Sequence, residues 1–163
     1  MKQLLVVYHS MTGATEQLAR AAVAGAASER DVDVRLLRAP DATSADVLTA
    51  DGYVFATPEN LASMAGLMKD FFDRIYYDAL ERINGRPYAV LIAAGTDGAG
   101  AARQLQRIAT GLRIKEVAPP TIVVNGAQTP EAIRAPKIVP DHDLGKAREL
   151  GAALAAGMAA GIF

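Results

Sequence analysis

The sequence predicts one α/β domain, residues 1–163, in which helices cover both faces of a five-stranded parallel sheet with strand order 2-1-3-4-5. Short apolar runs alternate with helical patterns along the chain, and this alternation is typical of parallel sheets. Apolar residues make up 51% of the chain, which is enough for a buried core at this length. Right-handed crossovers leave few arrangements, and we expect this order, a three-layer sandwich.

The first half of the chain begins with an apolar strand followed by a helix. Residues 4–8 are a continuous apolar run, and residues 15–28 carry apolar side chains at helical spacing. Residues 32–36 alternate apolar and charged side chains, which is typical of a strand near the sheet edge, and residues 52–56 form another apolar run. An amphipathic helix is predicted from residue 64 toward residue 80, with its apolar face on the sheet.

The second half continues the alternation. A proline opens the strand predicted at 88–93, a position where no ladder donor is required. A helix around residues 105–112 leads to the fifth predicted strand, 121–124, and the last helix runs over about 143–158. Residues 125–140 form the longest irregular segment, and three prolines interrupt it.

Composition and charge exclude several classes of function. The net charge is −1, so there is no broad basic field to bind nucleic acid. The absence of cysteine excludes disulfides, thiolate nucleophiles and Cys-based metal sites, so a redox role needs a bound cofactor. No signal peptide is evident, and the apolar stretch 150–163 is shorter than the roughly 20 residues that cross a bilayer. We therefore expect a cytoplasmic protein without a membrane partner or metal site.

The segment after the first strand has the composition of a phosphate site. Three hydroxyls, from Ser10, Thr12 and Thr15, and the permissive Gly13 lie where a helix begins. A helix N-terminus has unpaired N–H groups and a partial positive charge, so it binds phosphate without Lys or Arg. An ordinary helix cap is the alternative, and three hydroxyls beside a glycine make it the weaker one. No Walker lysine follows, which disfavours a triphosphate, and the partial Gly-x-Gly pattern from Gly98 ends in Arg103.

Two motifs resemble a known family. Residues 10–15, Ser-Met-Thr-Gly-Ala-Thr, resemble the phosphate loop (Ser/Thr)-x-Thr-Gly-x-Thr of flavodoxins, in the same place after the first strand. Residues 57–74 resemble a segment of NAD(P)H-dependent FMN reductases and Trp-repressor-binding-protein-type quinone reductases, in which a Thr-Pro loop precedes Met-Lys-x-Phe-x-Asp-Arg or similar. The likeness covers about residues 1–115, and it implies the flavodoxin-like fold throughout.

The resemblance implies that flavin mononucleotide (FMN) is bound by three segments. The phosphate loop would hold the phosphate, the second segment would wrap the flavin ring, and the third would close its other edge. The residues are Ser10, Met11, Thr12, Gly13, Ala14 and Thr15; then Thr57, Pro58, Glu59, Asn60 and Leu61; then Ala94, Gly95, Thr96, Asp97 and Gly98. No protein residue is expected to be catalytic, because the flavin itself receives and delivers the hydride.

The kind of flavoprotein is indicated by the absence of aromatic residues. The chain has no Trp, and neither 57–63 nor 94–100 contains an aromatic residue, so one flavin face should stay open. An open face favours an enzyme that passes electrons from NAD(P)H to a small acceptor such as a quinone. A flavodoxin-type electron carrier and a non-enzymatic interaction module are the alternatives. The acceptor and the choice between NADH and NADPH remain open.

Four other polar residues are candidates of lower rank. His9 is expected to be a structural residue at a strand end, and His142 to belong to an exposed helix cap. Arg103 and Arg107 lie one helical turn apart and could meet a nicotinamide phosphate, but a solvated helix face is the simpler interpretation.

Four aromatic residues on one helix predict a homodimer. Phe71, Phe72, Tyr76 and Tyr77 lie in adjacent pairs, and one helix cannot bury all four rings against one sheet. The dimers or higher oligomers of the resembled reductases imply the same. A monomer is the alternative, because Tyr tolerates partial exposure.

Overall fold

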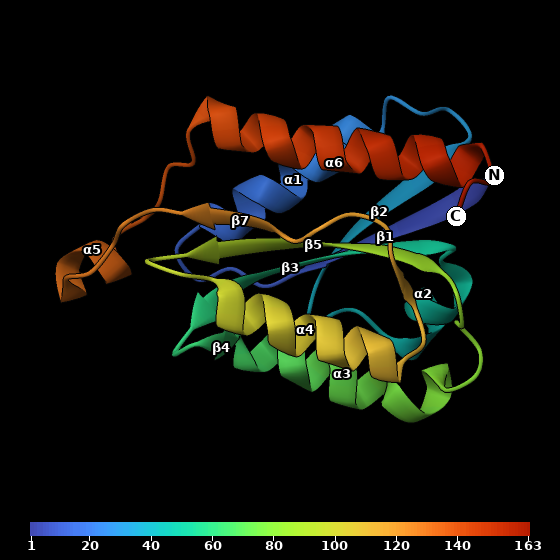
Figure 1. The fold of residues 1–163 in the computed structure, drawn as a ribbon, viewed down its shortest axis with the longest axis horizontal. Helices are drawn as coiled ribbons and strands as arrows, with labels where there is room; N and C mark the ends of the chain where they lie inside the picture. The colour runs from blue at the N-terminus through green and yellow to red at the C-terminus, as the bar shows by residue number, and fades with distance from the viewer.

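The chain folds into three layers, a twisted parallel sheet between two layers of helices (Figure 1). A computed structural model describes all of residues 1–163. The strands are β1 (Lys2–Tyr8), β2 (Val32–Arg38), β3 (Gly52–Asn60), β4 (Ser63–Met64), β5 (Pro87–Ala94), β6 (Lys115–Glu116) and β7 (Thr121–Val124). The helices are α1 (Ala14–Ala26), α2 (Ser44–Thr49), α3 (Gly66–Ala79), α4 (Ala99–Gly111), α5 (Pro130–Arg134) and α6 (Asp141–Ala159).

The order of the sheet confirms the prediction, with one difference at its edge. Strands β2, β1, β3 and β5 lie side by side, and both β6 and β7 pair with β5 in parallel. The fifth position in the order 2-1-3-4-5 is therefore occupied by two short strands. Pro119 and Pro120 lie between them, and since proline has no N–H to donate, the ladder is interrupted there.

The register of the three central strands brings their carboxyl ends to one edge. Tyr8 of β1 lies opposite Ala56 of β3, which lies opposite Leu91 of β5. The backbone N–H of His9 then donates to the carbonyl of Ala56 at 3.1 Å, at the point where β1 ends. The segments that follow β1, β3 and β5 consequently lie next to one another.

Both faces of the sheet are buried, as continuous apolar strands require. One core cluster packs β1 and β3 against α1 and α6, and the other packs them against α3 and α4. Helices α1 and α6 approach closely because Gly25 and Gly151 have no side chain: an added Cβ would lie 1.9 Å from the carbonyl oxygen of Arg148 and 2.0 Å from that of Ala22, respectively. No helix combines the length and apolar character needed to span a membrane.

The structure differs from the sequence prediction mainly around β3. This strand does not end at residue 56 but continues to Asn60 and turns back as β4. Helix α3 consequently begins at Gly66 and not at residue 64, since Ser63 and Met64 pair with β3. Two short helices, α2 and α5, were not predicted, and α5 lies within the segment expected to be irregular.

The aromatic residues of α3 divide into a buried and an exposed pair. Phe71 and Phe72 are both buried and pack against Phe55 of the sheet. Tyr76 and Tyr77 are 44% and 81% exposed, so this helix leaves two of its four rings without full cover. The homodimer stays a prediction.

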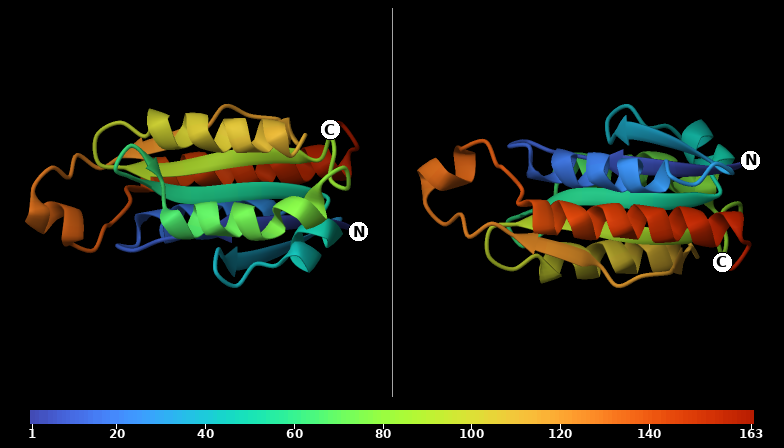
Figure 2. Two further views of the ribbon diagram at one scale, coloured as in Figure 1. Left: turned by 90° about the horizontal axis from the view of Figure 1, so that it is seen from below. Right: turned by 90° about the horizontal axis from the view of Figure 1, so that it is seen from above.

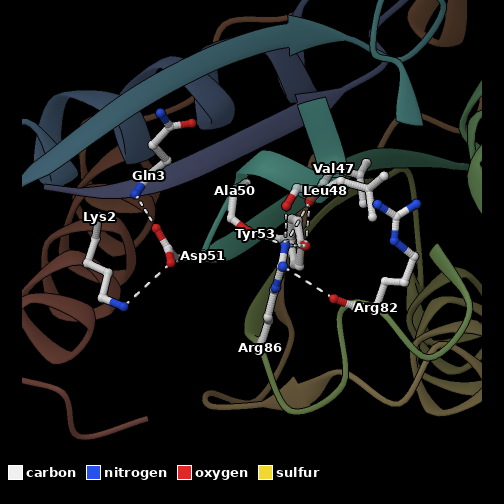
Figure 3. Close-up of polar contacts among 9 residues, drawn as sticks. All are labelled: Lys2, Gln3, Val47, Leu48, Ala50, Asp51, Tyr53, Arg82 and Arg86. Atoms are coloured by element: carbon white, nitrogen blue, oxygen red, sulfur yellow. Dashed lines mark hydrogen bonds and ion pairs between the residues drawn. The ribbon is translucent and has the colours of Figure 1, made fainter. Parts of the chain in front are cut away.

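The end of the sheet opposite the carboxyl edge, where the strands begin, is stabilised by Arg86 (Figure 3). Its guanidinium donates to the carbonyl oxygens of Val47 and Leu48 at 3.1 and 2.9 Å and to that of Ala50, which have no partner within α2 because the helix ends there. It also donates to the hydroxyl of the buried Tyr53. This network is far along the strands from the carboxyl edge and belongs to the scaffold.

Candidate functional site

A cavity of about 780 Å³ lies at the carboxyl edge of the sheet. In open parallel sheets this edge is the usual ligand site, and the volume lies within the roughly 300–1,000 Å³ of small-molecule pockets. Four segments form it, following β1, β3, β5 and β7. The lining residues are Ser10, Met11, Thr12, Ala14, Thr15, Pro58, Glu59, Asn60, Leu61, Ala62, Ala93, Ala94, Gly95, Thr96, Asn125, Ala127, Ile133, Arg134 and Lys137.

The segment between β1 and α1 presents free donors to this cavity. Gly13 adopts a left-handed conformation (φ 100°) before the helix, and its N–H donates to Ser10 Oγ at 3.2 Å. The next three N–H groups, of Ala14, Thr15 and Glu16, have no hydrogen-bond partner within the protein. The hydroxyls of Thr12 and Thr15 also bond to no other residue. This donor set, with the helix dipole behind it, fits a phosphate monoester.

The segment between β3 and β4 is a tight hairpin. Its two turn residues, Leu61 and Ala62, have φ values of 52° and 63°, the left-handed region that glycine and asparagine usually occupy in such turns. The Leu61 side chain is fully exposed at the cavity rim. Thr57 is buried behind the hairpin, where its Oγ1 accepts from the Ala65 N–H at 3.1 Å.

Glu59 joins the hairpin to helix α4. One carboxylate oxygen accepts from the Gly98 N–H at 2.9 Å and the other from the Ala101 N–H at 3.1 Å, so the side chain caps α4. Gly100 makes this approach possible, because an added Cβ would lie 2.2 Å from the Ala62 carbonyl oxygen. The carboxylate therefore fixes the second and third predicted segments relative to each other.

The segment between β5 and α4 also contacts the chain beyond β7. The Gly126 N–H donates to the carbonyl of Gly95 at 2.8 Å, and an added Cβ on Gly95 would lie 2.8 Å from the Ala127 carbonyl oxygen. Gly98 has a φ of 90° at the N-cap of α4. A side chain at either position would displace this wall of the cavity.

The structure brings most of the predicted site residues together. All three predicted segments line one cavity; only Gly13, Thr57, Asp97 and Gly98 of the predicted set do not. Sequence reasoning missed Ala62, Ala93 and five residues beyond β7: Asn125, Ala127, Ile133, Arg134 and Lys137. Their position could have indicated these five residues: residues 125–140 follow a strand, and parallel sheets of this kind bind ligands beyond the carboxyl ends of their strands.

The other candidate residues lie outside the cavity. His9 is 6% exposed, and its Nδ1 has no hydrogen-bond partner. Burial lowers the pKa of His9, and the nearby Arg38 cation lowers it further. Arg103, Arg107 and His142 are exposed and do not line the cavity.

Comparison with known proteins gives the family. The family model for NADPH-dependent FMN reductases matches residues 39–129, more than half of the chain. The chain belongs to this family. The match contains the hairpin after β3, the segment after β5 and, beyond β7, the lining residues Asn125 and Ala127, while the lining residues from Ile133 onward lie outside it.

The chain also matches individual curated proteins over part of its length. The chain is 35% identical over 100 residues to a flavodoxin of Aquifex aeolicus, covering 61% of this chain and 54% of that protein. It is 29% identical over 123 residues to an NAD(P)H dehydrogenase (quinone) of Acidithiobacillus ferrooxidans, covering 61% and 60%. The chain thus spans about half the length of the curated relatives it matches.

The fold of this family member is that of flavodoxins. A WrbA-like flavodoxin from Agrobacterium tumefaciens superposes with a TM-score of 0.73, at 19% identity, over 99% of both chains. A flavodoxin from the domain Archaea superposes with a TM-score of 0.76, at 20% identity, over 94% of this chain and 96% of that one. The predicted flavodoxin-like fold is confirmed.

Replacement of Glu59 should loosen the hairpin. We expect Glu59→Ala to lower the free energy of unfolding by about 1–2 kcal/mol, because a helix cap of this kind contributes about that much. Glu59→Gln, which retains one acceptor oxygen, should lie between Ala and wild type. Urea denaturation measures both, with Glu149→Ala on the exposed face of α6 as the control. Equal stability of Glu59→Ala and Glu149→Ala would contradict the capping role.

The buried His9 should make the protein sensitive to acid. Its folded-state pKa is lowered, so the unfolded chain binds the proton first, and stability is lost as the pH falls below about 6.5. Between pH 7.5 and 5.5, wild type should lose more free energy of unfolding than His9→Gln, by at most about 1.4 kcal/mol per pH unit. Denaturant titrations at several pH values measure this. His142→Gln should behave as wild type, and parallel curves for wild type and His9→Gln would refute the assignment.

Proposed function

We propose that residues 1–163 act as one domain that binds FMN non-covalently and transfers electrons from NAD(P)H to a small acceptor such as a quinone. The observation that carries the proposal is the row of unpaired N–H groups at the start of α1, which opens into a cavity shared with the hairpin and the segment after β5. Bound FMN would supply hydride and electron transfer, which no side chain of this cavity can provide.

The phosphate loop fits the cofactor's phosphate in donor number and charge. The free N–H groups of Ala14, Thr15 and Glu16 follow directly after the hydroxyls of Ser10 and Thr12, and Ser10, Thr12, Ala14 and Thr15 all line the cavity. A phosphate there would be stabilised by the helix dipole and by charge-assisted hydrogen bonds without a cationic side chain. Riboflavin, which lacks the phosphate, would leave these donors to water.

The flavin ring would lie between the hairpin and the segment after β5. Both segments are held by contacts to the rest of the protein: Glu59 to α4, and Gly95 to Gly126. Fixed backbone dipoles of this kind can stabilise charge on a cofactor without reorganising. These residues would orient the ring, and none would exchange a proton with the substrate.

The absence of aromatic residues favours a reductase over a carrier. No Phe, Tyr, Trp or His lines the cavity, so no ring is in place to stack on the flavin. The open side would admit a nicotinamide and then an acceptor in its place. The relative from Acidithiobacillus, an NAD(P)H dehydrogenase (quinone), supports a quinone as that acceptor. A homodimer through the exposed Tyr76 and Tyr77 of α3 belongs to the same proposal.

Flavin titration followed by turnover tests the proposal. The apoprotein should bind FMN at least about tenfold more tightly than riboflavin, because the phosphate contacts are charge-assisted hydrogen bonds. Thr15→Val should reduce this preference, and Thr110→Val, on exposed α4, should not. The loaded protein should oxidise NADPH or NADH in the presence of a benzoquinone. Binding without oxidation would favour the carrier, and no binding of either flavin would favour an interaction module.

A further inference from the structure

Residues 125–140 form an arm that projects beyond the carboxyl edge of the sheet and carries α5. Both views in Figure 2 show α5 outside the three layers. Almost all of the arm is exposed, so packing in the core does not explain its composition. Yet Ile133, Arg134 and Lys137 line the same cavity as the phosphate loop.

The return part of the arm is fixed to the phosphate loop. The Lys137 N–H donates to the carbonyl of Thr12 at 2.8 Å. The Gln17 side chain donates to the carbonyls of Gly13 and Lys137, at 3.0 and 2.8 Å, and accepts from the Val139 N–H at 3.0 Å. One side chain of α1 thus binds both segments, and the arm is held beside the predicted phosphate position.

Only one charged group of the cavity has no partner. The cavity is lined by three charged residues, Glu59, Arg134 and Lys137. The Glu59 carboxylate accepts two backbone N–H groups, and the Lys137 ammonium donates to the carbonyls of Ile133 and Ala135 at 2.9 and 2.6 Å. The Arg134 guanidinium makes no hydrogen bond and no ion pair with the protein.

We propose that Arg134 binds a phosphate group in this cavity. The inference rests on the proposed function, because that function names the two molecules, FMN and NAD(P)H, that would carry the phosphate. A guanidinium offers two parallel N–H donors that match two phosphate oxygens. The phosphate belongs either to FMN or to the nicotinamide nucleotide. The free donors of α1 already suit the first, so Arg134 either completes that site from the arm or recognises the second molecule.

The variant Arg134→Gln, with Arg148→Gln as control, separates these sources. Arg148 is likewise exposed and without an ion pair, on α6 and outside the cavity. If the phosphate is that of FMN, Arg134→Gln weakens FMN binding roughly tenfold and leaves riboflavin binding unchanged. If it belongs to the nucleotide, both flavins bind normally, while KM for NADPH rises roughly tenfold with kcat retained. Arg134→Lys should be intermediate, since it keeps the charge and loses the paired donors.

Failure of this inference is distinguishable from failure of the proposed function. If Arg134→Gln and Arg148→Gln bind FMN, riboflavin and NADPH alike, Arg134 is a solvated side chain and the inference is wrong. If neither flavin binds to wild type, the proposed function fails. Whether Arg134 binds phosphate is then tested by measuring the melting temperature (Tm) with and without inorganic pyrophosphate. Pyrophosphate should then raise the Tm of wild type more than that of Arg134→Gln; equal shifts would overturn the inference.

Discussion

The parallel register of β1, β3 and β5 is the constraint on which the rest of the molecule depends. Because Tyr8, Ala56 and Leu91 lie side by side in parallel strands, the carboxyl ends of the three strands lie at the same end of the sheet, and the segments that follow them line one cavity. Helix α1 starts at this edge, so its unpaired N–H groups lie near the carboxyl end of β1. A slip of one residue would exchange the two faces of β1, each of which is buried in a different core cluster, and would disrupt both cores.

A small number of side chains convert this edge into a defined cavity. Glu59 fixes the hairpin to α4, and Gln17 fixes the phosphate loop to the arm. Glycines at positions 95 and 100 allow the neighbouring backbones to approach. The cavity of this NADPH-dependent FMN reductase family member is thus held in shape by these two polar side chains and by the close backbone approach that the glycines allow.

The sequence was sufficient for the parts of this structure that depend on local pattern. Buried strands appear as apolar runs, and the hydroxyls beside Gly13 pointed to a segment that the structure places on the cavity. The hairpin was missed because Leu61 and Ala62 lack the glycine or asparagine that signals such a turn. Helix α2 was detectable from Thr43 and Asp46, which form its capping box. The Gln17 contacts were not, since they join residues about 120 positions apart in the sequence.

Amide NMR can show whether the free N–H groups of Ala14, Thr15 and Glu16 bind a phosphate. Spectra of ¹⁵N-labelled protein titrated with FMN and with riboflavin report each of these groups separately. We expect large downfield shifts of these three amide protons with FMN, and small shifts with riboflavin at equal saturation of the ring site. Equal shifts with both flavins, or shifts confined to other segments, would contradict phosphate binding by these groups.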